Sequence, residues 1–241
     1  MDEVLARERA DRDHKLARTE ELNRQTPSQH VEPSDLKAAS IRHLPLSLDG
    51  DSEHHPRFFN PYPEELPLPE KENEKDLLEF PPDPKHILWD TRDMEIFFTN
   101  HFSNSWEYAS DEYPDNPPPS GIYREIGDYK FGQLLESVGF NWYAVTVTEY
   151  PEGNYPHFKA MLESEAIGMI MTITDIMAAR LRTRSLRSHI IAPMLVISLM
   201  GPRHARLYDF SRKNTESAQL ITRYWLGGAC GQTTIETMNC K

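Results

Sequence analysis

Six cationic residues in the last third of the chain are the side chains whose types and spacing best suit a chemical role. They are Arg180, Arg184, Arg187, Arg203, His204 and Arg206. The first three recur at steps of four and three residues, so they share one face if this segment is helical. Arginine guanidiniums match phosphate and carboxylate groups through two parallel hydrogen bonds. The spacing therefore predicts a site for an anion or an acidic protein segment; the alternative is a solvated set of cations at the end of a helix dipole.

A second candidate is the cysteine within the small-residue run 227–234. Cys230 would act as a nucleophile if a base such as His189 or His204 lay beside it and backbone donors formed an oxyanion site. The spacing along the chain does not indicate that geometry, and the neighbouring glycines also suit a flexible tail. A cysteine-dependent hydrolase is kept as an alternative function.

Metal-dependent hydrolysis is the third chemistry that the sequence raises. A nuclease-like site needs acidic residues on adjacent strands to hold a divalent cation. The apolar run 190–200 contains no acid, and Asp209 and Lys213 lack their usual partners. Cys230 and Cys240, ten residues apart, and the scattered histidines match no zinc spacing. We expect no metal site and no cofactor, and a nuclease-like enzyme stays an alternative.

Charge and composition limit the class of protein. Residues 1–159 contain 16 Lys and Arg against 32 Asp and Glu, a net charge of −16, whereas residues 160–241 contain 10 against 6, a net charge of +4. The acidic balance argues against general nucleic-acid binding, although the basic last third leaves local contact with a nucleic acid open. Two cysteines, an N-terminus without an apolar stretch and a longest apolar run of 14 residues (166–179) predict no disulfide scaffold, signal peptide or membrane span. We therefore expect a cytoplasmic or nuclear protein.

Residues 1–85 are predicted to form a charged, proline-rich, disordered arm. Fifteen of the 19 prolines precede residue 120, and each removes a backbone donor. Opposite charges at i,i+4 spacing predict a marginal helix over residues 2–24. The aromatic residues Phe58, Phe59 and Tyr62 stand in a proline frame, which predicts a short motif that docks on a partner. A linker with only local clustering is the alternative.

Residues 86–241 are predicted to fold as one globular domain, large enough to bury a core. The expected elements in its first half are a helix over 91–102, a proline-rich surface loop over 110–120, a helix over 130–138 and a strand over 140–150. The helix follows a capping Asp90 or Thr91, and the strand is rich in β-branched and aromatic residues.

The strongest helical pattern follows Pro156, which suits a first helical turn. Apolar residues from Phe158 to Leu181 recur at steps of three and four residues, which predicts one amphipathic helix about 40 Å long. The continuous apolar run 189–200 predicts a strand buried on both faces. A second strand over 203–211, antiparallel to the first, and a closing helix over 216–226 complete the expected domain.

The order of motifs near the C-terminus resembles a known group. A proline-led apolar strand (187–202) precedes the arginine-bearing segment 203–206, a helix that ends in Arg-Tyr-Trp-Leu (223–226) and a Gly-Gln-Thr-Thr tail. Over residues 181–234 this order resembles a widespread group of uncharacterised filamentous-fungal proteins. The resemblance implies a fungal source and a domain boundary, and it implies no activity.

These patterns predict an α/β or α+β fold in which one long amphipathic helix packs on a small mixed sheet behind the disordered arm. Because no catalytic set is recognisable, the expected function is that of an interaction or adaptor protein. Its arm and its basic cluster would engage acidic or aromatic-motif protein partners. An enzyme with non-obvious catalytic residues and a local nucleic-acid binder are the alternatives.

Overall fold

Helices and a mixed β-sheet make up the computed structural model of the protein. It describes residues 2–25, 33–38, 42, 46–48, 54–68, 87–119, 124–125, 142–149, 155–164, 173–174, 177–178, 180–200, 204–205, 208–209 and 215–234. The helices are α1 (Asp2–Gln25), α2 (Pro33–Ala38), α4 (Ile87–Glu112) and α6 (Thr215–Leu226), with the 3-10 turn η3 (Arg184–Leu186). The strands are β1 (Arg124–Glu125), β2 (Trp142–Glu149), β3 (Phe158–Ser164), β4 (Met194–Met200), β5 (His204–Ala205) and β6 (Tyr208–Asp209).

The strands named above form one sheet in the order β1-β2-β3-β4-β5-β6. Strands β3 and β4 run parallel, with Phe158 opposite Met194, and the other neighbouring pairs run antiparallel. A parallel pair needs a crossover connection, and η3 lies on the path from β3 to β4. The mixed α/β class is therefore confirmed, as is the antiparallel pairing of the apolar strand β4 with β5.

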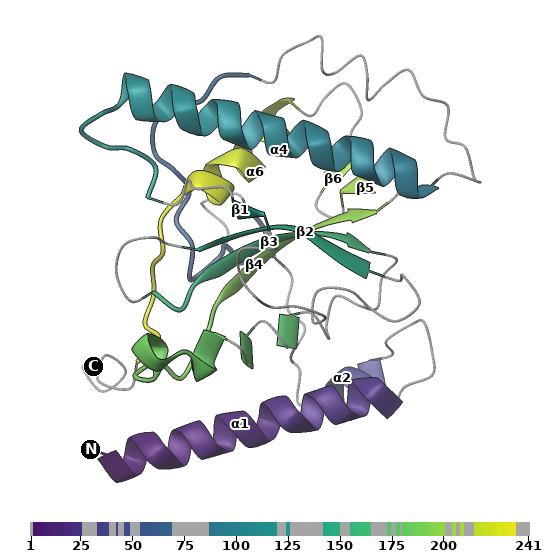
Figure 1. Ribbon diagram of the computed structural model, residues 1–241, viewed down its shortest axis with the longest axis vertical. Helices are drawn as coiled ribbons and strands as arrows, with labels where there is room; N and C mark the ends of the chain where they lie inside the picture. The colour runs from purple at the N-terminus through teal and green to yellow at the C-terminus, as the bar shows by residue number, and fades with distance from the viewer. Residues whose placement is uncertain are drawn as a thin grey trace.

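Helices α4 and α6 cover the sheet, and α1 lies at the far end of the molecule from α4 (Figure 1). The core lies between α4, α6, β3 and β4, where the Phe102 and Trp225 rings stack with centroids 4.9 Å apart. The buried cluster comprises Leu48, Phe59, Tyr62, Leu66, Phe98, Phe102, Ala109, Met161, Leu195, Ile197, Ile221, Tyr224, Trp225 and Leu226. Removal of this apolar surface from water is the main source of stability in such a core.

The helix predicted to begin at Pro156 is wrong at its start, because residues 158–164 form strand β3. The side chains from Phe158 to Met161 are all buried, so both faces of the strand are covered. When a strand is buried on both faces, the spacing of apolar residues no longer distinguishes it from a helix. Residues 180–182 are helical, whereas 165–172 lie outside the described residues.

Lys159 is a basic residue among the buried side chains of this strand. Its side chain is fully buried, and Nζ donates hydrogen bonds to the carbonyl oxygens of Trp225 (2.5 Å) and Gly227 (2.8 Å). Carbonyls at the C-terminal end of a helix lack intrahelical donors and carry partial negative charge, which favours a cation beside them. Burial acts in the opposite direction and lowers the pKa of Lys159 well below its ordinary value. The lysine thus joins the sheet to the end of α6.

The prediction of a separate disordered arm is wrong for residues 54–68. Phe59, Tyr62 and Leu66 from this segment belong to the same buried cluster as the helices and strands. A proline-rich composition excludes a regular ladder of backbone hydrogen bonds, but it does not exclude a single extended segment whose apolar side chains find a partner surface. The helix predicted over residues 2–24 is confirmed as α1.

Several shorter elements follow the expectations. The strand predicted over 140–150 is confirmed as β2 and the closing helix as α6, whose Ile221, Tyr224 and Trp225 face the core. The helix predicted over 91–102 is longer than expected, since α4 continues to Glu112. The proline-rich loop therefore begins at Tyr113. The helix predicted over 130–138 lies outside the described residues.

Candidate functional site

The segment 180–187, which we call the arginine turn, joins the helical residues before it to the run that leads into β4. Three successive backbone hydrogen bonds of 3.0 Å close it: Thr183 N to Arg180 O, Leu186 N to Thr183 O and His189 N to Leu186 O. Leu181 and Leu186 are each only 3% exposed. Because these leucines anchor the turn, the residues between them (182–185) and Arg187 are exposed.

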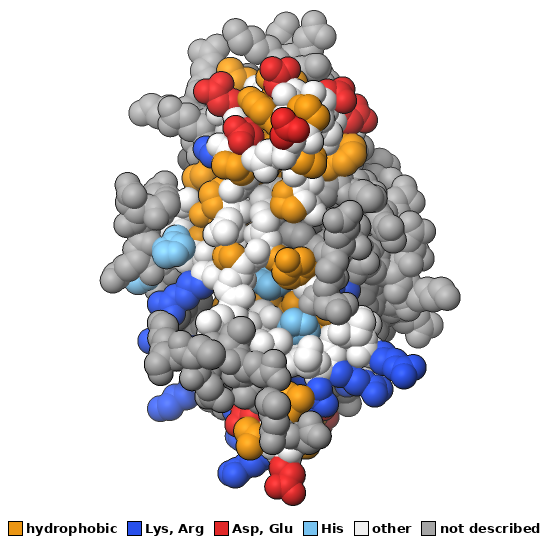
Figure 2. Space-filling view, turned by 90° about the vertical axis from the view of Figure 1, so that its left-hand side faces the viewer, with side chains coloured by type: hydrophobic (Ala, Val, Ile, Leu, Met, Phe, Trp, Pro, Cys, Tyr) orange, Lys and Arg blue, Asp and Glu red, His pale blue; other side chains and the backbone are white. Residues whose placement is uncertain are grey.

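Arg182, Arg184 and Arg187 are the exposed cations of the arginine turn. Within the ranges that the structure describes, none of the three forms an ion pair with a carboxylate. Most of the visible Lys and Arg side chains lie in the half of the molecule away from α4, whereas most of the visible Asp and Glu side chains lie at the α4 end (Figure 2). The turn therefore presents three guanidiniums to solvent on a fixed backbone.

Arg180 has a different role from the other arginines of the turn. Its Nη2 donates a 2.9 Å hydrogen bond to the carbonyl oxygen of Tyr155, and its guanidinium lies 5.7 Å from the centre of the Phe158 ring. In this cation–π contact the guanidinium packs on a ring of the protein and is less available to a ligand. Arg180 thus fastens the turn to the start of β3, and only part of the predicted helical arginine face is free to bind a ligand.

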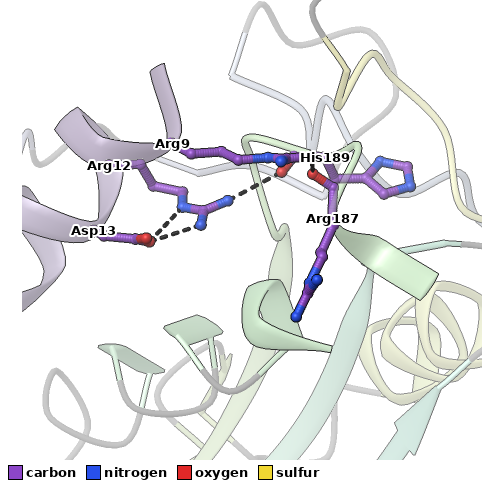
Figure 3. A network of polar contacts seen from close by, with 5 residues as sticks. All are labelled: Arg9, Arg12, Asp13, Arg187 and His189. Atoms are coloured by element: carbon purple, nitrogen blue, oxygen red, sulfur yellow. Dashed lines mark hydrogen bonds and ion pairs between the residues drawn. The ribbon is translucent and has the colours of Figure 1, made fainter. Parts of the chain in front are cut away.

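Helix α1 meets the end of the arginine turn through two arginines (Figure 3). Arg9 donates to the carbonyl oxygen of Arg187, and Arg12 Nη1 donates to that of His189 at 3.1 Å. The side chain of Arg187 itself points away from α1 (Figure 3). This contact was not predicted from the sequence, where its signal is the i,i+3 spacing of Arg9 and Arg12, which places them on one helix face.

Charge pairs within α1 differ partly from the pattern of the sequence. Lys15 pairs with Asp11 at 2.5 Å, as its i,i+4 spacing indicates. Arg12 pairs instead with its neighbour Asp13, through bonds of 2.7 and 2.9 Å. This pair holds the Arg12 guanidinium beside the carbonyl that it contacts.

His189 connects the arginine turn to the C-terminal segment. Its Nδ1 lies 2.8 Å from Thr233 Oγ1, and Ile190 N donates to the carbonyl oxygen of Thr233 at 2.9 Å. The ring is thus held by a threonine, and it stabilises the attachment of residues 233–234 to the start of the β4 segment.

The environment of Cys230 does not favour a nucleophilic thiol. Its Sγ lies 3.5 Å from the carbonyl oxygen of Arg57, and burial raises the pKa of the thiol. A raised pKa keeps the group protonated near neutral pH, whereas nucleophilic attack needs the thiolate. A histidine does contact this residue, but at its backbone: Nε2 of His157 lies 2.8 Å from the carbonyl oxygen of Cys230. Burial lowers the pKa of His157.

The remaining predicted site residues are dispersed. His204 lies on β5 opposite Met200, at the end of β4, while the arginine turn precedes the start of β4 at Met194. Six residue steps along a strand separate these ends by about 20 Å, so His204 does not join the turn. Arg203 and Arg206 lie outside the described residues. The aromatic motif residues Phe59 and Tyr62 are buried in the core, and Phe58 packs against it.

Two further kinds of site are absent from the described residues. No three His, Cys, Asp or Glu side chains there lie close enough together to hold a metal ion. None of the helices in the described ranges combines the length and the apolar character that a bilayer crossing requires. The chain matches no protein family, no curated protein and no solved structure.

Proposed function

We propose that the chain is an interaction protein whose arginine turn binds an acidic segment of a protein partner. One observation carries this proposal: Arg182, Arg184 and Arg187 are exposed on an anchored turn, and within the described residues no carboxylate pairs with them. Guanidiniums bind carboxylates through two parallel hydrogen bonds, and a fixed backbone reduces the entropy lost on binding.

The acidic partner is supplied by another molecule rather than by the described part of residues 54–68. Glu64 from that segment accepts a 2.8 Å hydrogen bond from Asn116 Nδ2, next to the end of α4. Figure 1 places the end of α4 and the arginine turn in different parts of the molecule. An internal pairing between Glu64 and the turn, which the charge distribution alone suggests, is therefore not formed.

A protein ligand fits the charge of the chain better than a nucleic acid. The whole chain carries a net charge of −12, which repels polyphosphates at long range, whereas a short acidic segment needs only a local positive surface. Arg9 and Arg12 of α1 bind backbone carbonyls at the end of the turn, so they leave its exposed guanidiniums unoccupied.

The test is a binding titration of the full chain with a fluorescein-labelled peptide of ten glutamates, read by fluorescence anisotropy. Three exposed charge pairs of about 0.5 kcal/mol each predict an affinity loss of about tenfold when Arg182, Arg184 and Arg187 are all changed to Gln. Arg184→Lys keeps the charge but loses the bidentate geometry, so it should weaken binding about twofold. Arg57→Gln, at an exposed arginine of another segment, is the matched control and should bind like the wild type.

Salt and a competing ligand complete the test. Binding should weaken from 0.1 to 1 M salt, since the screening length falls from about 10 to about 3 Å. Equal peptide affinity of the triple variant and the wild type would refute the proposal. Tighter binding of a ten-nucleotide single-stranded DNA than of the peptide, lost in the triple variant, would replace it with nucleic-acid binding.

A further inference from the structure

Residues 57–68, which we call the strap, lie along the end of α6 and the residues that follow it, with bends at 57, 58 and 64. Main-chain hydrogen bonds link Cys230 N to Phe58 O (3.0 Å), Asn60 N to Gly228 O (3.0 Å) and Tyr62 N to Arg223 O (2.7 Å). Phe59 and Ala229 also form an antiparallel bridge. This pattern is the one by which peptide-binding proteins hold an extended ligand.

Three side chains of the strap are its anchors. Tyr62 is 1% exposed, Phe59 5% and Leu66 8%, and all three join the cluster that α4 and α6 form. The Tyr62 hydroxyl donates a 2.7 Å hydrogen bond to the carbonyl oxygen of Asn116. Between the anchors, Asn60, Pro63 and Glu65 are exposed, whereas Pro61 and Glu64 are partly buried.

The protein surface under the strap also recognises its backbone. Arg223 donates from Nε to Tyr62 O (2.7 Å) and from Nη2 to Pro63 O (2.9 Å). Gln219 Nε2 donates to Leu66 O at 3.1 Å. Charged and amide side chains that bind main-chain carbonyls select an extended peptide by its shape, independently of its exposed side chains.

The backbone approaches the strap closely at Gly227. A Cβ atom at this position would lie 1.9 Å from the carbonyl oxygen of Asn60. The strap backbone therefore lies so close to position 227 that no residue larger than glycine fits there.

We infer that the α4–α6 surface under the strap is a peptide-recognition site, and that the strap is its intramolecular occupant. Its external ligand is an extended, proline-framed peptide with Phe, Tyr and Leu anchors at the spacing of Phe59, Tyr62 and Leu66. The contacts described above fall within residues 58–66, so a short peptide contains all the recognised groups and no second folded domain is needed. The inference is independent of the arginine turn, which lies on other elements.

The strap competes with any such ligand because it belongs to the same chain. A tethered segment acts at an effective concentration on the order of millimolar. A free peptide at micromolar concentration therefore displaces little of it, and a change that weakens the strap exposes the site. The arrangement gives the partner peptide access only when the strap is released.

The experiment uses a fluorescein-labelled peptide of residues 54–68 and full-length chains. Tyr62→Ala in the chain weakens the strap, and this variant should bind the peptide at least tenfold more tightly than the wild type does. The peptide should also raise the melting temperature of the variant. Phe59→Leu is a milder strap variant that tests the same point if Tyr62→Ala does not fold.

Two controls separate specific recognition from general apolar binding. A peptide with alanine at the positions of Phe59, Tyr62 and Leu66 should bind at least tenfold more weakly to the same variant. Adding Arg223→Gln to the Tyr62→Ala chain should also weaken binding, because the donors to two ligand carbonyls are lost. Adding the Arg182, Arg184 and Arg187 changes should leave peptide binding unchanged.

Two results would overturn the inference. One is the absence of peptide binding by both strap variants, or equal binding of the anchor-free peptide. The other is a dimer of the strap-weakened chain that excludes the peptide, since a second copy would then be the occupant.

Discussion

The strap and helix α1 both lie on the outside of the molecule, yet they are attached in different ways. The strap buries Phe59, Tyr62 and Leu66 and pairs its backbone with the end of α6. Helix α1 contacts the arginine turn through the guanidiniums of Arg9 and Arg12.

The exposure of apolar side chains distinguishes the two segments further. Val4 of α1 is 56% exposed, whereas each strap anchor is less than a tenth exposed. Buried anchors make the strap part of the folding unit, while hydrogen bonds from two partly buried guanidiniums to backbone carbonyls contribute less to stability. Proline content and charge therefore do not reveal whether a surface segment belongs to the core or can separate from it.

The largest expected change in stability follows from a substitution in the strap. Tyr62→Ala removes a buried aromatic ring and its hydrogen bond to Asn116 O, and should lower the free energy of unfolding by about 4 kcal/mol. Urea denaturation of the variant and the wild type measures the change. Tyr108→Ala, at a ring that is 42% exposed, is the control and should change stability by about 0.5 kcal/mol or less. Equal effects of the two changes would show that the strap is not part of the cooperative core.

Acid should weaken the core that holds the strap. Burial lowers the pKa of His101 in α4 from 6.5 to about 4. The unfolded chain therefore takes up the proton first, and stability is lost as the pH falls from 6.5 to about 4 and levels off below. The loss attributable to His101 is about 3 kcal/mol. Urea midpoints at pH 7, 6, 5 and 4 measure it.

A non-titrating variant isolates this histidine. His101→Gln should show a smaller loss between pH 6.5 and 4, with a residual slope in the same direction from His157, whose pKa burial also lowers. His54→Gln, at an exposed histidine, should follow the wild type. A pH dependence that is identical in all three chains would contradict the assignment.

Adjacent glycines give a sharper test of the contact between strap and α6. Gly227→Ala places a Cβ atom 1.9 Å from Asn60 O and 2.8 Å from Arg223 O, so backbone must move, at a cost of about 2 kcal/mol. In Gly228→Ala the nearest atom, Pro119 Cγ, lies at an ordinary contact distance of 3.7 Å. The second variant should keep nearly the wild-type melting temperature. The comparison fails if Gly227→Ala is as stable as Gly228→Ala.

The smallest expected effect is on the α1 side. Changing Arg9 and Arg12 together to Ala should lower the global free energy of unfolding by less than about 1 kcal/mol, since the contacts are few and partly exposed. Amide hydrogen exchange over residues 2–25 should nevertheless become faster. Arg7→Ala, at an exposed position of the same helix, is the control. A loss of stability comparable to that of Tyr62→Ala would place α1 in the core.

Elements whose pattern is local were predictable from the sequence. Strand β2 is rich in β-branched and aromatic residues, and α6 has one clear apolar face, so both were assigned near their observed positions. Strand β3 was not, because burial on both faces gives the apolar spacing of a helix as readily as that of a strand. The strap was missed since its partner surface lies about 160 positions later in the chain, and composition carries no information on such pairing.

The candidate site was predictable only in part, for a related reason. Arg180, Arg184 and Arg187 of the turn were predicted as site residues, and Arg184 and Arg187 are exposed as a binding role requires. The contact of Arg180 with Phe158 depends on β3 being a strand. Because a helix was predicted there, Arg180 was assigned to the ligand-binding face instead of to packing. His204 was predicted to belong to the same basic site, whereas the length of β4 separates it from the turn.

The buried amine of Lys159 makes it possible to measure, by chemical modification, how often the interior of the sheet opens. Its amine is enclosed between β3 and the end of α6, so an acylating reagent reaches it only during an opening that separates the two. Lys15, whose side chain is 64% exposed, reacts without any opening and supplies the reference rate in the same molecule. The intact protein is modified, digested and analysed by mass spectrometry. The ratio of the two modification rates reports how often β3 and the end of α6 separate. Each separation of β3 from the end of α6 can thus leave a stable covalent modification on Lys159.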